Sequence, residues 1–127
     1  MSRQVEHGRF VILEHRWNGV HWDFMLEAGD SLRTWAIDSP IVVGVDLPAR
    51  ALGDHRLEYL TYEGPVSGGR GEVRRFDAGS FRTIEWSADR VRVELAGTQL
   101  VGEAGLYRVG SDSSDPSKWN LRLGNVD

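Results

Sequence analysis

The stretch Val20-His21-Trp22-Asp23-Phe24-Met25-Leu26-Glu27 alternates apolar and polar side chains. Period-two alternation is typical of a β-strand with one buried and one polar face. The same alternation recurs along the chain, and turn residues interrupt it every eight to twelve residues. Many short strands at this spacing indicate an all-β barrel or sandwich.

The pattern predicts where the strands lie. Strands are expected over residues 9–14, 20–27, 32–37, 57–62, 91–95, 100–109 and 119–123. Residues 72–76 and 81–86 are expected to form a hairpin around Asp77-Ala78-Gly79. Residues 48–51 are expected to form one helical turn, residues 64–71 a glycine-rich loop, and residues 110–118 a polar connection.

The composition restricts the class of protein. The 127 residues fit one domain, 1–127, with a core at about 9–123. The chain has no cysteine, which excludes disulfides, zinc sites built on thiolates and cysteine nucleophiles. The first seven residues lack the apolar core of a signal peptide, and no stretch is as apolar as a membrane span. We therefore expect a monomer in the bacterial cytosol or nucleoid, with no membrane association.

The net charge of −4 bears on nucleic-acid binding. A protein that coats DNA without sequence preference needs a basic surplus, which this chain lacks. An enzyme that grips one strand end remains compatible with the charge.

A candidate metal site lies next to the opening stretch. His21 and Asp23 are two residues apart on a predicted strand, so they project from one face. The turn pair Asn18-Gly19 can fold the preceding strand back and bring His15 to them. Two imidazoles and a carboxylate suit Mn²⁺, Fe²⁺ or Zn²⁺, and ligand type does not choose among these ions. The alternative is that these are ordinary exposed strand residues.

The surrounding residues resemble a known family. Residues 15–27, His-Arg-Trp-Asn-Gly-Val-His-Trp-Asp-Phe-Met-Leu-Glu, are similar to the signature of the 3′-phosphoesterase domain of bacterial ATP-dependent DNA ligase D. That signature reads roughly His-Asp-Ala-x-x-x-His-Tyr-Asp-Phe-Arg-Leu-Glu. Three further segments match: Leu-Arg-Thr-Trp-Ala-Ile at 32–37, Asp-His-Arg-Leu-Glu-Tyr at 54–59 and Tyr-Glu-Gly at 62–64. The resemblance covers residues 9–123 in unbroken order.

The resemblance implies a fold and an activity. It implies a compact β-barrel of about eight strands with one or two short helical segments. It further implies a phosphoesterase that uses a divalent metal, Mn²⁺ before Zn²⁺, to trim DNA 3′ ends in non-homologous end joining. The substrates would be a terminal ribonucleoside and then a 3′ phosphate.

The same resemblance assigns roles to individual residues. His15, His21 and Asp23 would hold the metal, and His55 and Tyr59 would be catalytic. Arg50 and Arg33 are the expected substrate-binding residues, with Arg56 and Arg70 as further candidates. Taken alone, His55 could instead cap a turn, and Tyr59 could be an aromatic at the edge of the core.

Two residues depart from the family pattern. Met25 stands where the family has an arginine, and Ser39 where it has a lysine. A missing phosphate contact removes about 1.5–3 kcal/mol, which can slow catalysis while the metal still binds. A non-catalytic module that binds strand ends or a repair protein is therefore the alternative, and an enzyme with a different substrate is a third. Separate ligase, polymerase or Ku-type proteins would act in trans.

Overall fold

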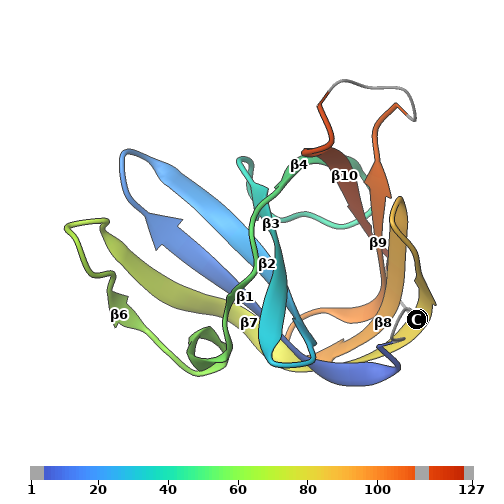
Figure 1. Ribbon diagram of the computed structural model, residues 1–127, viewed down its shortest axis with the longest axis horizontal. Coiled ribbons are helices and arrows are strands. Elements are labelled where there is room, and N and C mark those ends of the chain that lie inside the picture. The colour runs from blue at the N-terminus through green and yellow to red at the C-terminus, as the bar shows by residue number, and fades with distance from the viewer. Residues whose placement is uncertain (1–4, 111–114, 125–127) are drawn as a thin grey trace.

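A computed structural model describes residues 5–110 and 115–124, and in these ranges eight strands close an antiparallel β-barrel (Figure 1). The strand order around the barrel is β1-β2-β3-β4-β10-β9-β8-β7, and β7 pairs back onto β1. Two short strands lie off this path: β5 pairs with β3, and β6 pairs with β7. The all-β barrel predicted from the sequence is confirmed.

The barrel is built from β1 (His7–Arg16), β2 (Val20–Ala28), β3 (Ser31–Ile37), β4 (Asp46–Ala51), β7 (Glu72–Trp86), β8 (Arg90–Gly97), β9 (Val101–Arg108) and β10 (Lys118–Leu123). The short elements are β5 (His55–Arg56), the 3₁₀ helix η1 (Leu57–Leu60) and β6 (Gly64–Pro65). No helix in the described ranges is long and apolar enough to cross a membrane.

The barrel interior is the larger of two apolar clusters. Alternate residues of each strand point inward, among them Phe24, Trp35, Leu106 and Leu121, which are all fully buried. Burying one such side chain stabilises the fold by roughly 1.5–3 kcal/mol. The interior therefore supplies the main stability of the domain.

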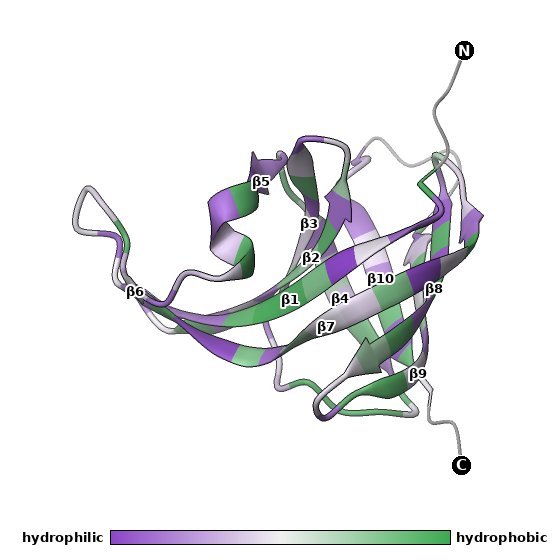
Figure 2. Cartoon of the chain, turned by 90° about the horizontal axis from the view of Figure 1, so that it is seen from below, coloured by the Kyte–Doolittle hydropathy of each residue, from purple (hydrophilic) through white to green (hydrophobic). Residues whose placement is uncertain are grey.

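A second apolar cluster lies outside the barrel wall. Val11, Leu13, Met25 and Leu32 project from the outer face of β1 to β3, and Leu60 of η1 packs over them. Figure 2 shows η1 and β5 outside the wall that β1, β2 and β3 form. The segment with β5 and η1 therefore covers part of the outer face of these strands. A cavity lies between this segment and the strands, lined by Leu13 and Met25 on one side and by Tyr59 on the other.

In two segments the structure contains a different type of secondary structure from the one predicted. The helical turn predicted over 48–51 is wrong: these residues belong to strand β4, whose Leu47 and Ala49 face the interior while Pro48 and Arg50 face outward. The strand predicted over 57–62 is wrong as well, because residues 57–60 form η1. A spacing of three between Leu57 and Leu60 suits a 3₁₀ helix, and both leucines pack on the outer cluster.

The predicted hairpin around residues 77–79 is also wrong. Residues 72–86 form one continuous strand, β7, with irregular register at two points. Gly79 serves close packing instead of a turn, since a Cβ there would lie 2.1 Å from the Ala96 carbonyl oxygen. The Asp77 side chain is buried and accepts hydrogen bonds from the backbone N–H groups of Ala78, Thr98, Gln99 and Leu100.

The remaining predicted strands are confirmed to within two residues at each end. The turn at Asn18-Gly19 is also confirmed, with φ values of 53° and 110°. Of the predicted connection over 110–118, residues 111–114 lie outside the described part of the chain.

The buried Asp77 carboxylate gives a stability prediction. Replacing Asp77 by Ala leaves the N–H groups of the β8–β9 turn without their acceptor, and we expect the free energy of unfolding to fall by about 3 kcal/mol. Asp46→Ala is the control, because among residues 5–110 and 115–124 that exposed carboxylate pairs with Arg122 alone, and it is expected to contribute less than about 1 kcal/mol. Urea unfolding measures both. Equal losses for the two variants would contradict the assignment.

Candidate functional site

The tight hairpin between β1 and β2 brings His15, His21 and Asp23 together. In the antiparallel register His15 lies opposite His21, and Leu13 lies opposite Asp23. His21 Nε2 is 3.1 Å from Asp23 Oδ1, and His15 Nδ1 is 3.8 Å from Asp23 Oδ2. One ligand atom from each of the three residues lies within 4.8 Å of the others. The predicted convergence is therefore present in the fold.

The state of the Asp23 carboxylate fits a cation at this point. Asp23 is 4% exposed, and its buried Oδ1 accepts no hydrogen bond of normal geometry. The close contact with His21 Nε2 is thus not aligned as a hydrogen bond. Because the nearby His21 Nε2 is poorly aligned as a donor, this buried oxygen is incompletely satisfied, and a bound cation would compensate for that cost. Two imidazole nitrogens and this oxygen are a donor set that first-row divalent ions accept.

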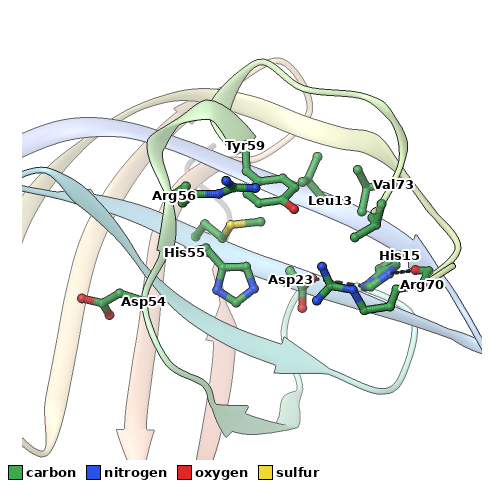
Figure 3. Close-up of a pocket in the computed structure, with 11 residues that line it drawn as sticks. Leu13, His15, Asp23, Asp54, His55, Arg56, Tyr59, Arg70 and Val73 are labelled. Carbon is green, nitrogen blue, oxygen red and sulfur yellow. Dashed lines mark hydrogen bonds and ion pairs between the residues drawn. The ribbon is translucent and has the colours of Figure 1, made fainter. Parts of the chain in front are cut away.

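A backbone carbonyl orients the His15 ring. His15 Nε2 is 2.8 Å from the carbonyl oxygen of Arg70, and because a carbonyl only accepts, Nε2–H is the donor. In the neutral imidazole the lone pair is then on Nδ1, and it is Nδ1 that faces Asp23. Figure 3 shows both interactions of this ring as dashed lines. A hydrogen bond that fixes the tautomer of an imidazole is the usual accompaniment of metal ligation.

The Asp23 carboxylate also affects His21. It raises the pKa of His21 above its ordinary value, mainly through the direct contact with the ring and also through its charge, while partial burial of the ring opposes this. Asp38 adds to the rise, and Arg50 counteracts it. A metal ion at this site would therefore compete with a proton on His21.

A cavity of about 350 Å³ adjoins these residues. His15 and Asp23 line it, whereas His21 does not. The rings of His55 and Tyr59 project into the same cavity from β5 and η1 (Figure 3). The structure thus brings four of the five predicted metal and catalytic residues to one cavity and places the fifth directly beside it.

The His55 ring is also held by a carbonyl. Its Nδ1–H donates to the Gly53 carbonyl oxygen at 2.9 Å, so Nε2 is the nitrogen available to a bound molecule. The ring packs edge-on against Tyr59 at 6.0 Å between centroids. The alternative reading of His55 as a turn cap is partly right, since this hydrogen bond is local, but the ring still borders the cavity.

The two arginines predicted to bind substrate lie elsewhere. Arg50, on the outer face of β4, pairs with Asp38 through two contacts of 3.1 Å, and this pairing raises the pKa of Arg50. Arg33 packs over the rings of Trp35 and Trp119, and burial lowers its pKa. Neither residue lines the cavity. The cations that do line it are Arg56 and Arg70.

Met25 and Ser39, the two departures from the family pattern, lie in different parts of the structure. Met25 is 1% exposed, packs in the outer apolar cluster and lines the floor of the cavity. Ser39 lies outside the cavity, and its buried Oγ has no hydrogen-bond partner. Nothing in the structure explains the serine.

Sequence reasoning missed the role of the Arg70 carbonyl. The signal for it in the sequence is the glycine at position 71. The structure requires a glycine there, because Gly71 has φ +74° and lies against the β1–β2 turn. A Cβ on Gly71 would lie 1.8 Å from the Arg16 carbonyl oxygen and 2.8 Å from Trp17 Cβ. This close approach is what places Arg70 beside His15.

Comparison with known proteins gives the family. The family model described as "DNA Ligase D 3'-phosphoesterase domain" matches residues 13–108. The chain belongs to this family. It is 35% identical over 112 residues to a "Multifunctional non-homologous end joining DNA repair protein LigD" of Mycobacterium tuberculosis, and equally to a "Multifunctional non-homologous end joining protein LigD" of Mycobacterium bovis. Each match covers 81% of this chain and 15% of the relative, so the chain spans a small part of those proteins.

The Gly71 contact predicts an effect on metal affinity. Gly71→Ala forces the loop away from the turn and removes the Arg70 carbonyl from His15, so we expect Mn²⁺ affinity to fall roughly 10–100-fold. Gly69→Ala is the matched control, because Gly69 has a similar φ of +68° and no atom near the added methyl group. Calorimetric titration measures both. Equal affinities in the two variants would refute the orienting role.

The raised pKa of His21 predicts a pH dependence of the metal-free protein. Its contribution to stability is fully present below the unfolded-state pKa of about 6.5 and is lost as the pH rises through the higher folded-state pKa. In chelator, the difference in unfolding free energy between wild type and His21→Asn should therefore decrease from pH 6 upward. A difference that stays constant or grows would contradict the assignment.

Proposed function

We propose that this domain is a metal-dependent phosphoesterase that trims 3′-ribonucleoside and 3′-phosphate ends of DNA during repair. One observation carries the proposal: His15, Asp23 and the rings of His55 and Tyr59 meet at a single cavity that two arginines border, and His21 completes the His-His-Asp set directly beside it. The membership of the chain in the DNA ligase D 3′-phosphoesterase family supports the same substrate class.

The metal would be held by His15 Nδ1, His21 Nε2 and the Asp23 carboxylate. Mn²⁺ is the ion that the family resemblance favours, with Zn²⁺ as the alternative. When bound, a divalent ion would act as a Lewis acid on a phosphoryl oxygen. The Arg70 carbonyl would orient one of these ligands, because its hydrogen bond with Nε2 fixes the tautomer of His15.

His55 would handle a proton. Because its Nδ1–H is committed to the Gly53 carbonyl, only Nε2 can exchange a proton with a substrate. Water would attack phosphorus, and a protonated Nε2 would give its proton to the leaving oxygen as the phosphoester bond breaks. A positioned general acid contributes about 10²–10⁴-fold to the rate.

The remaining polar groups of the cavity would orient the phosphate. Arg56 has one ion-pair contact, with Glu58 at 3.6 Å, so its guanidinium can turn to a bound oxyanion. Arg70 donates to the Ser67 carbonyl through Nε at 2.8 Å and contacts Ser67 Oγ through Nη2 at 3.5 Å, and its side chain borders the cavity. The Tyr59 hydroxyl offers a neutral donor. These groups compensate for the absent arginine at Met25.

The proposal extends to partners. The relatives that match this chain are several times longer than it. We propose that separate ligase, polymerase or Ku-type end-joining proteins act together with this domain.

A second candidate function is a non-catalytic module that binds strand ends. The burial of Met25 in the cavity floor favours it, because an apolar thioether cannot contact a phosphate as an arginine would. If the metal site is vestigial, affinity for a strand end should be unchanged by a chelator. Strict metal dependence of binding would count against this candidate.

The test of the first candidate separates metal binding from catalysis. We expect Mn²⁺ to raise the Tm of the wild type, and His21→Ala to abolish both this shift and hydrolysis of a 3′-phosphate end. His55→Ala should retain the shift but lose about 10²–10⁴-fold in rate. His7→Ala is the control, since His7 is exposed and lies outside the cavity.

Two results would contradict the proposal. One is a metal-loaded wild type that leaves 3′-phosphate and 3′-ribonucleotide ends intact. The other is a His55→Ala variant as active as His7→Ala, which would remove His55 from the chemistry.

A further inference from the structure

Trp17 is an exposed tryptophan beside the proposed metal site. Its side chain is 45% exposed, whereas Trp22, Trp35 and Trp119 are buried. The remaining tryptophan, Trp86, is partly buried. A large aromatic surface that stays in water in a small domain is available for a ligand.

The ring is held in place by its neighbours. It lies nearly parallel to the imidazole of His15, with an interplanar angle of 21° and 6.2 Å between the ring centroids. The backbone N–H of Trp17 donates to the Gly19 carbonyl at 2.9 Å, and Gly71 lies close to Trp17 Cβ, so these two contacts fix the backbone from which the ring projects. A rigid aromatic surface loses little conformational entropy when a planar group stacks on it.

The position of the ring specifies what would stack there. The indole does not line the cavity, but it stacks on His15, which lines the cavity and belongs to the set that would hold the metal. A phosphate bound at this set would therefore be separated from the indole by the width of one imidazole ring. The base attached through the sugar to that phosphate is then within reach of the ring. Stacking of a base on an aromatic side chain contributes about 1–3 kcal/mol and tolerates any base.

The negative net charge of the protein limits how strongly it can hold a strand end through ion pairs. With a net charge of −4, the chain has no surplus of cations for a long phosphate backbone. Of the arginines near the ring, Arg16 is paired with Glu14 at 3.0 Å. Stacking needs no charge and depends little on salt, so it can hold a strand end where ion pairs are few.

We propose that Trp17 is a stacking platform for the nucleobase next to the reacting phosphate. The platform selects ends that carry a base over abasic ends. This inference rests on the proposed function, since it assumes a nucleic-acid end in the cavity.

The test compares two strand ends. Two oligonucleotides that carry a 3′ phosphate are used, one with a normal terminal nucleotide and one with an abasic terminal nucleotide. Their affinities are measured by fluorescence anisotropy in Mn²⁺. We expect the wild type to prefer the base-bearing end by about tenfold, the equivalent of roughly 1.4 kcal/mol. Trp17→Leu should lose this preference, and Trp17→Phe should keep most of it.

Controls separate stacking from a structural role. Val101→Ala alters another exposed apolar residue, on β9 and outside the cavity, and should keep the preference. Trp17→Leu should match the wild type in Mn²⁺ affinity. In the unmodified protein, the base-bearing end should quench the emission of the exposed tryptophan more strongly than the abasic end does.

The outcomes distinguish the two proposals. If the wild type binds and trims ends but Trp17→Leu keeps the preference, the stacking inference is wrong and the proposed function stands. If the wild type binds neither end, both are wrong. If Trp17→Leu no longer binds a ligase, polymerase or Ku-type protein that the wild type binds, but still prefers the base-bearing end over the abasic end, Trp17 is a protein contact and the inference fails.

Discussion

The antiparallel register between β1 and β2 is the constraint on which the site depends. It places His15 opposite His21 and Leu13 opposite Asp23, so that three ligand atoms meet on the outer face of the barrel. A slip of one residue in β2 would turn this strand over, exposing Phe24 and burying Asp23 in the barrel interior. The large apolar interior therefore fixes the register, and the register in turn fixes the candidate metal ligands.

Two apolar layers on either side of the same strands create the cavity. The inner layer fixes the barrel, and the outer layer holds η1 and β5 against the wall, which brings His55 and Tyr59 opposite His15. Met25 belongs to the outer layer, so its burial is part of what positions the catalytic candidates. An apolar residue at this point thus has a structural function, and the positive charge of the cavity comes from Arg56 and Arg70.

The sequence predicts the strands and the ligand cluster well because both follow from local pattern. Alternation in residues 20–27 identifies β2, and the pair Asn18-Gly19 identifies the turn that returns His15 to His21. Contacts between distant segments are not encoded in local pattern. The sequence therefore suggests Arg33 and Arg50 as substrate contacts, although Trp35, Trp119 and Asp38 engage them, and it gives no sign that the Arg70 carbonyl contacts His15. Gly79 suggests a turn because sequence cannot separate a turn from close packing against Ala96.

The central claim is that His15, His21 and Asp23 bind one divalent metal at the edge of the cavity. Diffraction from crystals grown with Mn²⁺ and phosphate, recorded at the manganese absorption edge, tests it most directly. We expect one anomalous peak in contact with His15 Nδ1, His21 Nε2 and an Asp23 oxygen, with the phosphate between it and His55. A peak elsewhere, or no peak at this cluster at saturating Mn²⁺, would show that these three residues do not form the metal site.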